Sequence, residues 1–170
     1  MSSEDWLLKI EQMKQKEKEI EANAKAKEKA WEELEEKYKD EATKIIELLN
    51  SELKKVVDVY TDPSLQDYDK PKVEGDNRSV KLNIPIVRGG SHYSFGISFW
   101  LKLTEKGYGL DVAKTTYFAR DDKPYEYKSS IPPPITASAI QKEVTEVLQA
   151  RNEAITVLAE KEDKFRKGWS

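Results

Sequence analysis

Residues 4–60 read EDWLLKIEQMKQKEKEIEANAKAKEKAWEELEEKYKDEATKIIELLNSELKKVVDVY, a stretch with neither glycine nor proline. Its apolar and aromatic residues recur in steps of three and four, the spacing of a helix with one packed side. These residues are Ile10, Met13, Ile20, Ala24, Trp31, Leu34, Tyr38, Ile45 and Leu48. Ser2, with Asp5 three residues later, is a helix-start signal, and Pro63 ends the pattern after Tyr60. The sequence therefore predicts one long helix, or two nearly collinear helices, over residues 4–60.

The first half of this predicted helix has an unusual surface. Residues 14–29 are mostly Lys and Glu, with Ile20 and alanines as the only apolar surface, so a solvated helix face is the favoured interpretation. An apolar tip precedes them, made of Trp6, Leu7, Leu8, Ile10 and Met13. A lipid-binding helix is disfavoured because the polar side carries Glu throughout as well as Lys.

Composition narrows the class of protein. Of the 170 residues, 38% are hydrophobic and 36% charged, so the core is modest and much of the chain is surface. The formal net charge of −3 argues against a general nucleic-acid binder. The absence of cysteine excludes disulfides and thiolate metal sites and fits a reducing compartment. Because the sequence has no apolar run of membrane-spanning length and no secretory-type start, we expect a cytoplasmic protein without membrane association.

Beyond residue 60 the pattern changes from helical spacing to alternation. Residues 61–78 are rich in Asp, Pro and other turn formers and are predicted to form a loop. Alternating runs then predict strands at residues 80–87, 93–103, 110–118 and 125–129. We therefore expect an antiparallel β-meander of three or four strands, in chain order, with one apolar face.

The registers of the first two hairpins are predicted by matching apolar faces, because a one-residue slip would move a whole set of side chains to the other face. A two-residue loop at Gly89-Gly90 gives the pairs Arg88–Ser91, Ile86–Tyr93, Ile84–Phe95 and Leu82–Ile97. A loop at Lys106-Gly107 gives the pairs Leu103–Leu110, Leu101–Val112, Phe99–Lys114 and Gly96–Tyr117. Pro85 has no N–H to donate away from the second strand, so the first strand should lie at the edge of the sheet.

A second helix is predicted after the stiff proline linker at residues 131–135. Ser138 and Gln141 form a capping box, and the apolar stripe continues to about residue 167, with Arg151 expected to extend to its edge. The predicted fold class is α+β, with this helix packing antiparallel on the first in a coiled-coil-like pair. The predicted domains are a projecting helical arm at residues 1–30 and an α+β domain at residues 31–170, which comprises helix 31–60, sheet 79–129 and helix 138–167.

The two predicted helices differ in length by a factor of about two, roughly 85 Å against roughly 45 Å at 1.5 Å per residue. Antiparallel pairing would bring Phe165 and Trp169 near Trp31 and Leu34, and would leave residues 4–29 without a partner in the same chain. An unpacked helix gains little stability, so we expect this segment to bind another protein chain, most simply a second copy. The predicted partner-binding residues are Trp6, Leu7, Ile10, Met13 and Ile20. The alternative is a bend near Asn23 that folds the tip back onto its own chain.

No residue cluster has the spacing of a catalytic, cofactor or metal site, so we expect a non-catalytic protein with no cofactor. The single histidine, His92, is interpreted as a surface strand residue, and Asp121-Asp122 as turn formers. The aspartates of the first loop lack the glycine and terminal Glu of a calcium loop.

The polar face of the predicted sheet supports an alternative function. Its candidate nucleic-acid-binding residues are Lys81, Trp100, Lys102 and Tyr117. Aromatic rings beside basic groups on a sheet hold single-stranded nucleic acid, although cover by another helix or subunit is favoured here because the protein is acidic. A third hypothesis is a small-ligand pocket lined by Tyr93, Phe95 and Phe99, with Lys114 pointing in. Lys114 interrupts the apolar face and must reach an edge, an acidic partner or an anion.

The favoured function is therefore an interaction or assembly protein. In this interpretation the N-terminal helix joins chains, and the sheet serves as a base or a recognition surface.

Overall fold

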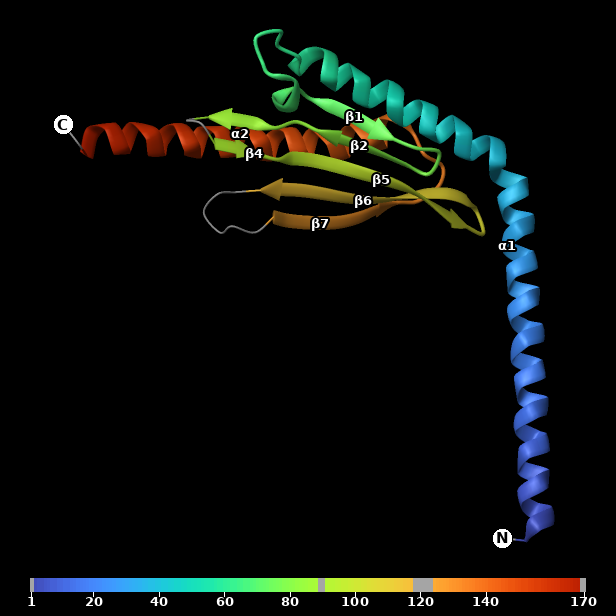
Figure 1. Ribbon diagram of the computed structural model, residues 1–170. Coiled ribbons are helices and arrows are strands. Elements are labelled where there is room, and N and C mark those ends of the chain that lie inside the picture. The colour runs from blue at the N-terminus through green and yellow to red at the C-terminus, as the bar shows by residue number, and fades with distance from the viewer. Residues whose placement is uncertain (1, 89–90, 118–123, 169–170) are drawn as a thin grey trace. The chain divides into compact units, whose positions relative to one another are not determined.

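The computed structural model describes residues 2–88, 91–117 and 124–168, and it confirms the predicted α+β class (Figure 1). Helix α1 spans Ser3–Tyr60, and helix α2 spans Ala137–Gly168. A short 3₁₀ helix at Asp67–Asp69 precedes the strands. The strands are β1 Lys72–Gly75, β2 Ser79–Asn83, β3 Ile86–Arg88, β4 Ser91–Tyr93, β5 Phe95–Thr104, β6 Gly107–Tyr117 and β7 Pro124–Ile131.

The chain divides into two compact units, an N-terminal unit at residues 1–39 and a sheet unit at residues 40–170. The sequence placed this boundary earlier, at residue 30. The N-terminal unit is helical from Ser3, and a reciprocal capping box begins the helix as predicted. The Asp5 N–H donates to Ser2 Oγ at 3.1 Å, and the Ser2 N–H donates to Asp5 Oδ2 at 3.4 Å. The other end of α1 is closed by Thr61, whose hydroxyl donates to the Val57 carbonyl at 2.6 Å.

The sheet unit contains a five-stranded antiparallel sheet in the order β1-β2-β5-β6-β7, together with a separate β3-β4 pair. The predicted chain order of the meander is confirmed, but the prediction that residues 61–78 form only a loop is wrong. Strand β1 lies in that stretch and pairs with β2. It has a single apolar side chain, Val73, between Lys72 and Glu74, which is too little alternation to predict a strand.

The register of the first hairpin is confirmed, and that of the second is shifted by two residues. Leu82 lies opposite Ile97 and Ile86 opposite Tyr93, as predicted. In the second hairpin Leu101 lies opposite Leu110, because Thr104 and Gly107 close the turn. Gly107 takes φ +118°, a conformation that favours glycine. It therefore belongs to the last strand pair, with Thr104, and the two loop residues are Glu105 and Lys106. A shift of two preserves the faces of a strand, so matching apolar faces could not detect it.

Pro85 does not mark an edge strand, as the sequence suggested. Strand β2 has neighbours on both sides, since β1 pairs with Val80–Asn83. Pro85 lies in the break between β2 and β3, beyond the last residue that β1 pairs, so its missing N–H disturbs no ladder.

The two helices run in the same direction within the sheet unit, so the predicted antiparallel packing is wrong (Figure 1). The Gln141 side chain donates to Glu52 at 2.9 Å, and further along both helices the Arg151 guanidinium lies 5.1 Å from the centre of the Tyr60 ring. These contacts advance together along α1 and α2. The cause is strand β1, because five reversing strands between two helices return the chain in its original direction, whereas four would have returned it in the opposite one.

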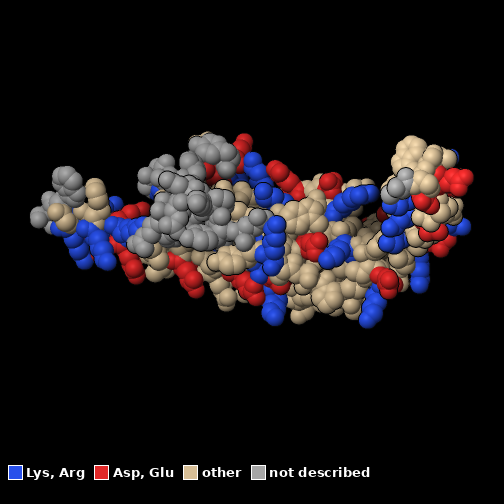
Figure 2. Space-filling model, turned by 90° about the horizontal axis from the view of Figure 1, so that it is seen from below, with Lys and Arg blue, Asp and Glu red and all other residues tan. Residues whose placement is uncertain are grey.

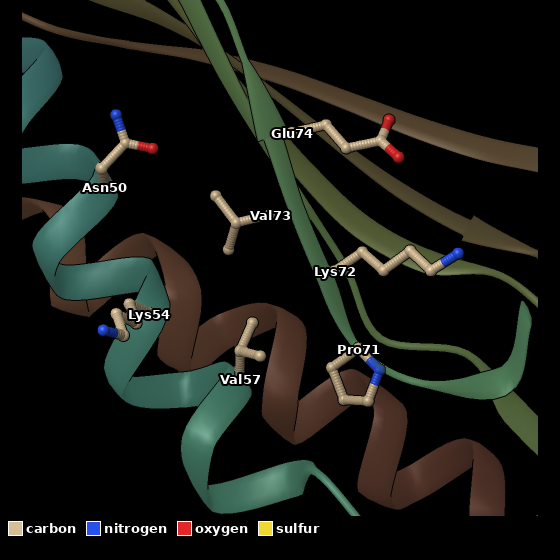
Figure 3. Close-up of a pocket in the computed structure, with 7 residues that line it drawn as sticks. All are labelled: Asn50, Lys54, Val57, Pro71, Lys72, Val73 and Glu74. Carbon is tan, nitrogen blue, oxygen red and sulfur yellow. The ribbon is translucent and has the colours of Figure 1, made fainter. Parts of the chain in front are cut away.

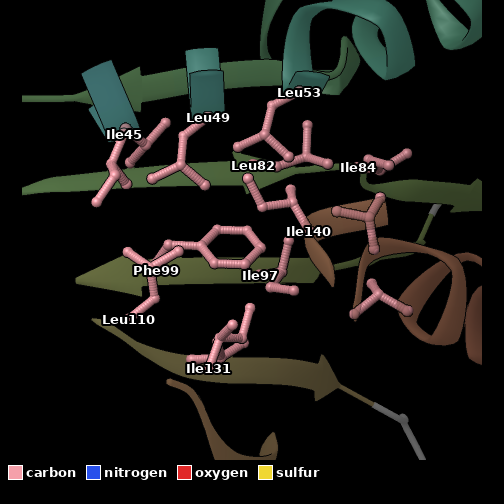
Figure 4. Close-up of a cluster of buried hydrophobic side chains, with 14 residues drawn as sticks. Ile45, Leu49, Leu53, Leu82, Ile84, Ile97, Phe99, Leu110, Ile131 and Ile140 are labelled. Carbon is pink, nitrogen blue, oxygen red and sulfur yellow. The ribbon is translucent and has the colours of Figure 1, made fainter. Parts of the chain in front are cut away.

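The main core lies between the helices and one face of the sheet. Figure 4 shows Ile45, Leu49 and Leu53 pointing from α1 toward the strands, where Phe99 is fully buried. Helix α2 contributes Ile140, Val144 and Val147 to the same cluster. A second cluster joins the later turns of α2 to the β3–β5 region through Ile86, Phe95, Ala154 and Leu158.

Candidate functional site

The large apolar residues of α1 from Trp6 to Trp31 are exposed, and they include the five that the sequence predicts to bind a partner. Between 42% and 64% of the surface of each is accessible. They are Trp6, Leu7, Leu8, Ile10, Met13, Ile20 and Trp31. Trp6, Ile10, Met13 and Ile20 follow helical spacing and lie on one side of α1, whereas Leu7 and Leu8 point away from that side, Leu8 nearly opposite to it. This side of the helix is the largest run of exposed apolar residues among the residues described.

The same helix behaves differently in the sheet unit. Its buried residues are Ile45, Leu49 and Leu53, all beyond residue 40. Every residue from Ser2 to Glu33 is exposed, although the steps of three and four continue through both halves. The same periodic pattern therefore forms an apolar side in both halves of α1. Only the half in the sheet unit has that side covered by residues of its own unit.

Three of the four predicted nucleic-acid-binding residues lie together on the polar face of the sheet. Trp100 and Lys102 are alternate residues of β5, and Lys81 on the neighbouring strand β2 lies opposite Ser98. Trp100 is 43% exposed, so no helix or strand of the described chain buries it. The predicted cover over Trp100 is therefore not present in the described part of this chain.

Lys81 and Lys102 each have an acidic neighbour. Lys81 lies opposite Glu74, and Lys102 Nζ lies 3.8 Å from Asp111 Oδ1. Where Figure 2 shows the sheet unit in colour, basic and acidic side chains alternate without a continuous field of either sign. Acidic neighbours reduce the local attraction for phosphate groups, which dominates nucleic-acid affinity.

Tyr117 is the fourth residue predicted for that face, and its backbone lies farther along the strand than predicted. Gly96 lies opposite Thr115 rather than Tyr117, because the second hairpin is shifted by two. The backbone of Tyr117 pairs with Pro124 at the end of β6, six residues beyond Asp111, the partner of Trp100. At about 3.3 Å per residue this is roughly 20 Å along the strand. The Tyr117 side chain lies outside what the structure describes.

Lys114 interrupts the apolar face of β6 and binds an acidic partner, one of the three outcomes predicted for it. It lies opposite Ile97 rather than Phe99, and its ammonium forms ion pairs with Glu143 and Glu146 of α2. Burial alone would lower the pKa of Lys114, but hydrogen bonds to the two carboxylates outweigh it, so the pKa is raised. The same contacts hold the pKa of Glu146 below its usual value. The arrangement fixes α2 to the sheet.

The predicted small-ligand pocket is occupied by the core itself. Phe99 packs in the main cluster and Phe95 in the second, with 0% and 1% of their surfaces exposed. Tyr93 packs against the second cluster. With Lys114 neutralised by two carboxylates, neither the space nor the free cation of that hypothesis is present at these residues.

Arg151 is held more tightly than its predicted role at the edge of the helix suggests. Its Nη2 donates to the Pro85 carbonyl at 3.1 Å, and its guanidinium stacks on Tyr60. Burial lowers the pKa of Arg151, although guanidinium remains charged at any ordinary pH. With Asp69 and Ile155 it lines a hollow of about 180 Å³ beside β3. The position of Arg151 within an apolar stripe was the feature of the sequence that pointed to this hollow.

A wider groove, of about 460 Å³, lies between α1 and the edge strand β1 (Figure 3). Val57 and Val73 face each other across it, while the Lys72 and Glu74 side chains point away from the helix. Four of its lining residues are polar, namely Asn50, Lys54, Lys72 and Glu74, and Figure 3 shows that their side chains do not point toward one another.

The remaining sequence candidates are the aspartates of the first loop, His92 and the Asp121-Asp122 pair. Among the described residues no group of three His, Asp or Glu side chains could hold a metal ion. Asp62 is used locally, since hydrogen bonds from the Ser64 backbone and then its hydroxyl lower the pKa of the carboxyl. The side chain of His92, together with Asp121 and Asp122, lies outside the described residues.

No described helix combines the length and the apolar character needed to cross a lipid bilayer. The chain matches no family model, and neither the curated proteins nor the solved structures include a match to it.

Proposed function

We propose that this chain is a non-catalytic assembly protein whose N-terminal unit binds another protein chain, with the sheet unit as its folded base. The observation that carries this proposal is the exposed apolar side of α1 at Trp6, Ile10, Met13 and Ile20. A helix whose apolar side remains in water gains little stability from packing, and exposed apolar patches of this kind mark binding surfaces.

Light scattering on the full chain and on a chain lacking residues 2–13 tests the proposal. The full chain should have a mass of more than one subunit, and the deletion should reduce the number of subunits in each particle. If the shortened chain kept the same number of subunits, binding through this tip would be ruled out.

A matched pair of substitutions separates the apolar side from the rest of the helix. Met13→Lys introduces a charge on that side, whereas Gln12→Lys introduces the same charge next to it. Both positions are exposed and lie outside the sheet unit, so neither change should disturb its fold. The proposal requires that only Met13→Lys weakens association. Equal effects would mean that overall charge, not the apolar surface, controls it.

A second candidate function is binding of single-stranded nucleic acid by the polar sheet face. It is supported by the exposed ring of Trp100 between Lys81 and Lys102, and weakened by Glu74 and Asp111. Titration with single-stranded RNA at low salt should show salt-dependent binding that Trp100→Ala reduces. Tyr127→Ala is the control, because Tyr127 is also exposed, at 62%, but lies on the other face of the sheet, where it is the cross-strand partner of Lys114. The absence of salt-dependent binding would exclude this function.

A further inference from the structure

The apolar side of the N-terminal unit follows a regular seven-residue repeat. Steps of three and four connect ten positions without a gap, the pattern by which two helices interlock along a seam. These positions are Trp6, Ile10, Met13, Glu17, Ile20, Ala24, Lys27, Trp31, Leu34 and Tyr38. We call this set the seam. It covers residues 6–38, nearly the whole of the N-terminal unit.

Two positions of the seam are charged, and they have opposite signs. Glu17 and Lys27 stand where the repeat calls for apolar residues, and both are exposed. An isolated charge in a packed seam is costly, but a complementary pair costs less and fixes how the two helices align. The seam therefore carries information about its partner.

A parallel pair of identical helices is disfavoured by these charges. In a parallel pair each seam residue lies beside its own copy, so Glu17 would meet Glu17 of the partner subunit, and Lys27 would meet the partner's Lys27. Like charges in direct contact oppose association.

An antiparallel pair removes this conflict in one register. When residues whose numbers add up to 44 lie opposite each other, Glu17 meets the partner's Lys27, and Lys27 meets the partner's Glu17. In the remaining layers, residues of one helix lie opposite residues of the other: Trp6 opposite Tyr38, Ile10 opposite Leu34, Met13 opposite Trp31 and Ile20 opposite Ala24. Two-fold symmetry repeats each of these contacts once. Every apolar position therefore meets an apolar one, and the thioether of Met13 meets an indole ring, a favourable contact.

The neighbouring antiparallel registers fail on the same criterion. Shifting the sum by one heptad, to 37, places Glu17 opposite the partner's Ile20. Shifting it to 51 places Glu17 opposite the partner's Leu34. Either shift also leaves seam residues at one end of the unit without an opposite residue, whereas a sum of 44 uses all ten. The positions that flank the seam do not distinguish between the registers. With a sum of 44, Lys14 lies beside the partner's Glu28, which is favourable, but Lys9 lies beside the partner's Lys37, which is unfavourable.

We infer that the chain bound by the N-terminal unit is a second copy of this protein, and that residues 6–38 of the two copies form a two-fold symmetric antiparallel coiled coil with Glu17 against Lys27. This inference rests on the assembly function proposed above and specifies its partner and geometry.

A charge exchange in the full chain tests the register. Glu17→Lys and Lys27→Glu each create like-charged layers, so each should weaken the dimer by roughly tenfold or more, measured as a dissociation constant by sedimentation. The double variant Glu17→Lys/Lys27→Glu restores opposite charges and should return to within about threefold of the unchanged protein. Glu19→Lys, which makes the same charge change away from the seam, is the control and should have little effect. Failure of the double variant to recover would overturn the register.

Disulfide trapping tests the orientation independently. The chain has no cysteine, so Ile10→Cys and Leu34→Cys each provide a single thiol. In the inferred register these positions lie opposite each other, and a mixture of the two variants should form a cross-linked dimer that neither forms alone. Cross-linking within each variant alone would indicate a parallel pair and overturn the inference while leaving assembly intact. A monomer at every concentration would overturn the proposed function as well.

Discussion

At the scale of single residues, Lys114 is the charged group with the clearest energetic role. The side chains of Lys114 and Glu143 are only 12% and 15% exposed, and Glu146 completes the cluster. Because the pKa of Lys114 is raised in the folded state, its stabilising contribution is present below the ordinary lysine value of about 10.5 and is lost as the pH rises above it. Because the pKa of Glu146 is lowered, its contribution is present above its ordinary value of about 4.5 and is lost as the pH falls. The cluster therefore stabilises the fold most between these limits.

Lys114→Met should lower the free energy of unfolding by about 3 kcal/mol at pH 7, since it leaves Glu143 nearly buried without its cation. Urea unfolding measures this loss of free energy, which should become smaller as the pH falls below about 4.5 and Glu146 takes up a proton. Lys102→Met is the control, because Lys102 is 58% exposed and 3.8 Å from Asp111, a surface contact of little energy. Equal losses in the two variants would contradict a special role for the buried cluster.

Gly107 is the residue whose backbone sets the register of the second hairpin. At φ +118° a side chain is strained, and a Cβ there would lie 2.9 Å from Glu41 Oε1. Gly107→Ala should therefore destabilise the fold by about 2 kcal/mol in thermal or chemical unfolding. Gly168→Ala is the matched control, since a Cβ at that position meets nothing within 4 Å. A neutral Gly107→Ala would show that the turn can take another conformation.

At the scale of elements, the sequence predicted the faces of the strands better than their alignment. Alternation identifies which residues share a face, so the strands containing Leu82, Ile97 and Val112 were predicted correctly. It is insensitive to a shift of two, which the conformation of Gly107 decides. It also cannot detect β1, whose only apolar residue is Val73. That one missed strand changed the predicted direction of α2 relative to α1.

Helix α1 gives an element-scale prediction because its two halves have the same periodicity and different surroundings. Leu49→Ala, at 0% exposure, should cost about 2–5 kcal/mol of unfolding free energy, since it opens a cavity against the sheet. Ile20→Ala, at 60% exposure, should leave the unfolding of the sheet unit unchanged. Urea unfolding followed by near-ultraviolet circular dichroism at low protein concentration compares the two. A large loss in Ile20→Ala under these conditions would mean that the N-terminal unit supports the fold of the sheet unit.

At the scale of the whole molecule, the sequence indicated surfaces but not chemistry. The exposed residues Trp6, Ile10 and Met13 could be predicted because no local pattern offered them a cover. The acidic partner of Lys114 could be predicted only as a type, because Glu143 and Glu146 approach it through the fold of α2 over the sheet. The position of Tyr117 relative to Trp100 depended on register and was therefore missed.

The division into two units predicts that helix content in the N-terminal unit depends on protein concentration. Every residue of the buried clusters lies at or beyond Ile45, so residues 40–170 should fold without the N-terminal unit. A helix without packed neighbours is marginal in water, and association stabilises it by mass action. On dilution, the full chain should lose circular dichroism at 222 nm while a chain of residues 40–170 keeps its signal per residue. Hydrogen exchange should then localise the loss to residues 3–39 and leave residues 45–60 protected. A helix signal in the full chain that stays constant down to nanomolar concentration would mean that the N-terminal helix is stable without a partner, and the energetic reason for assembly would be gone.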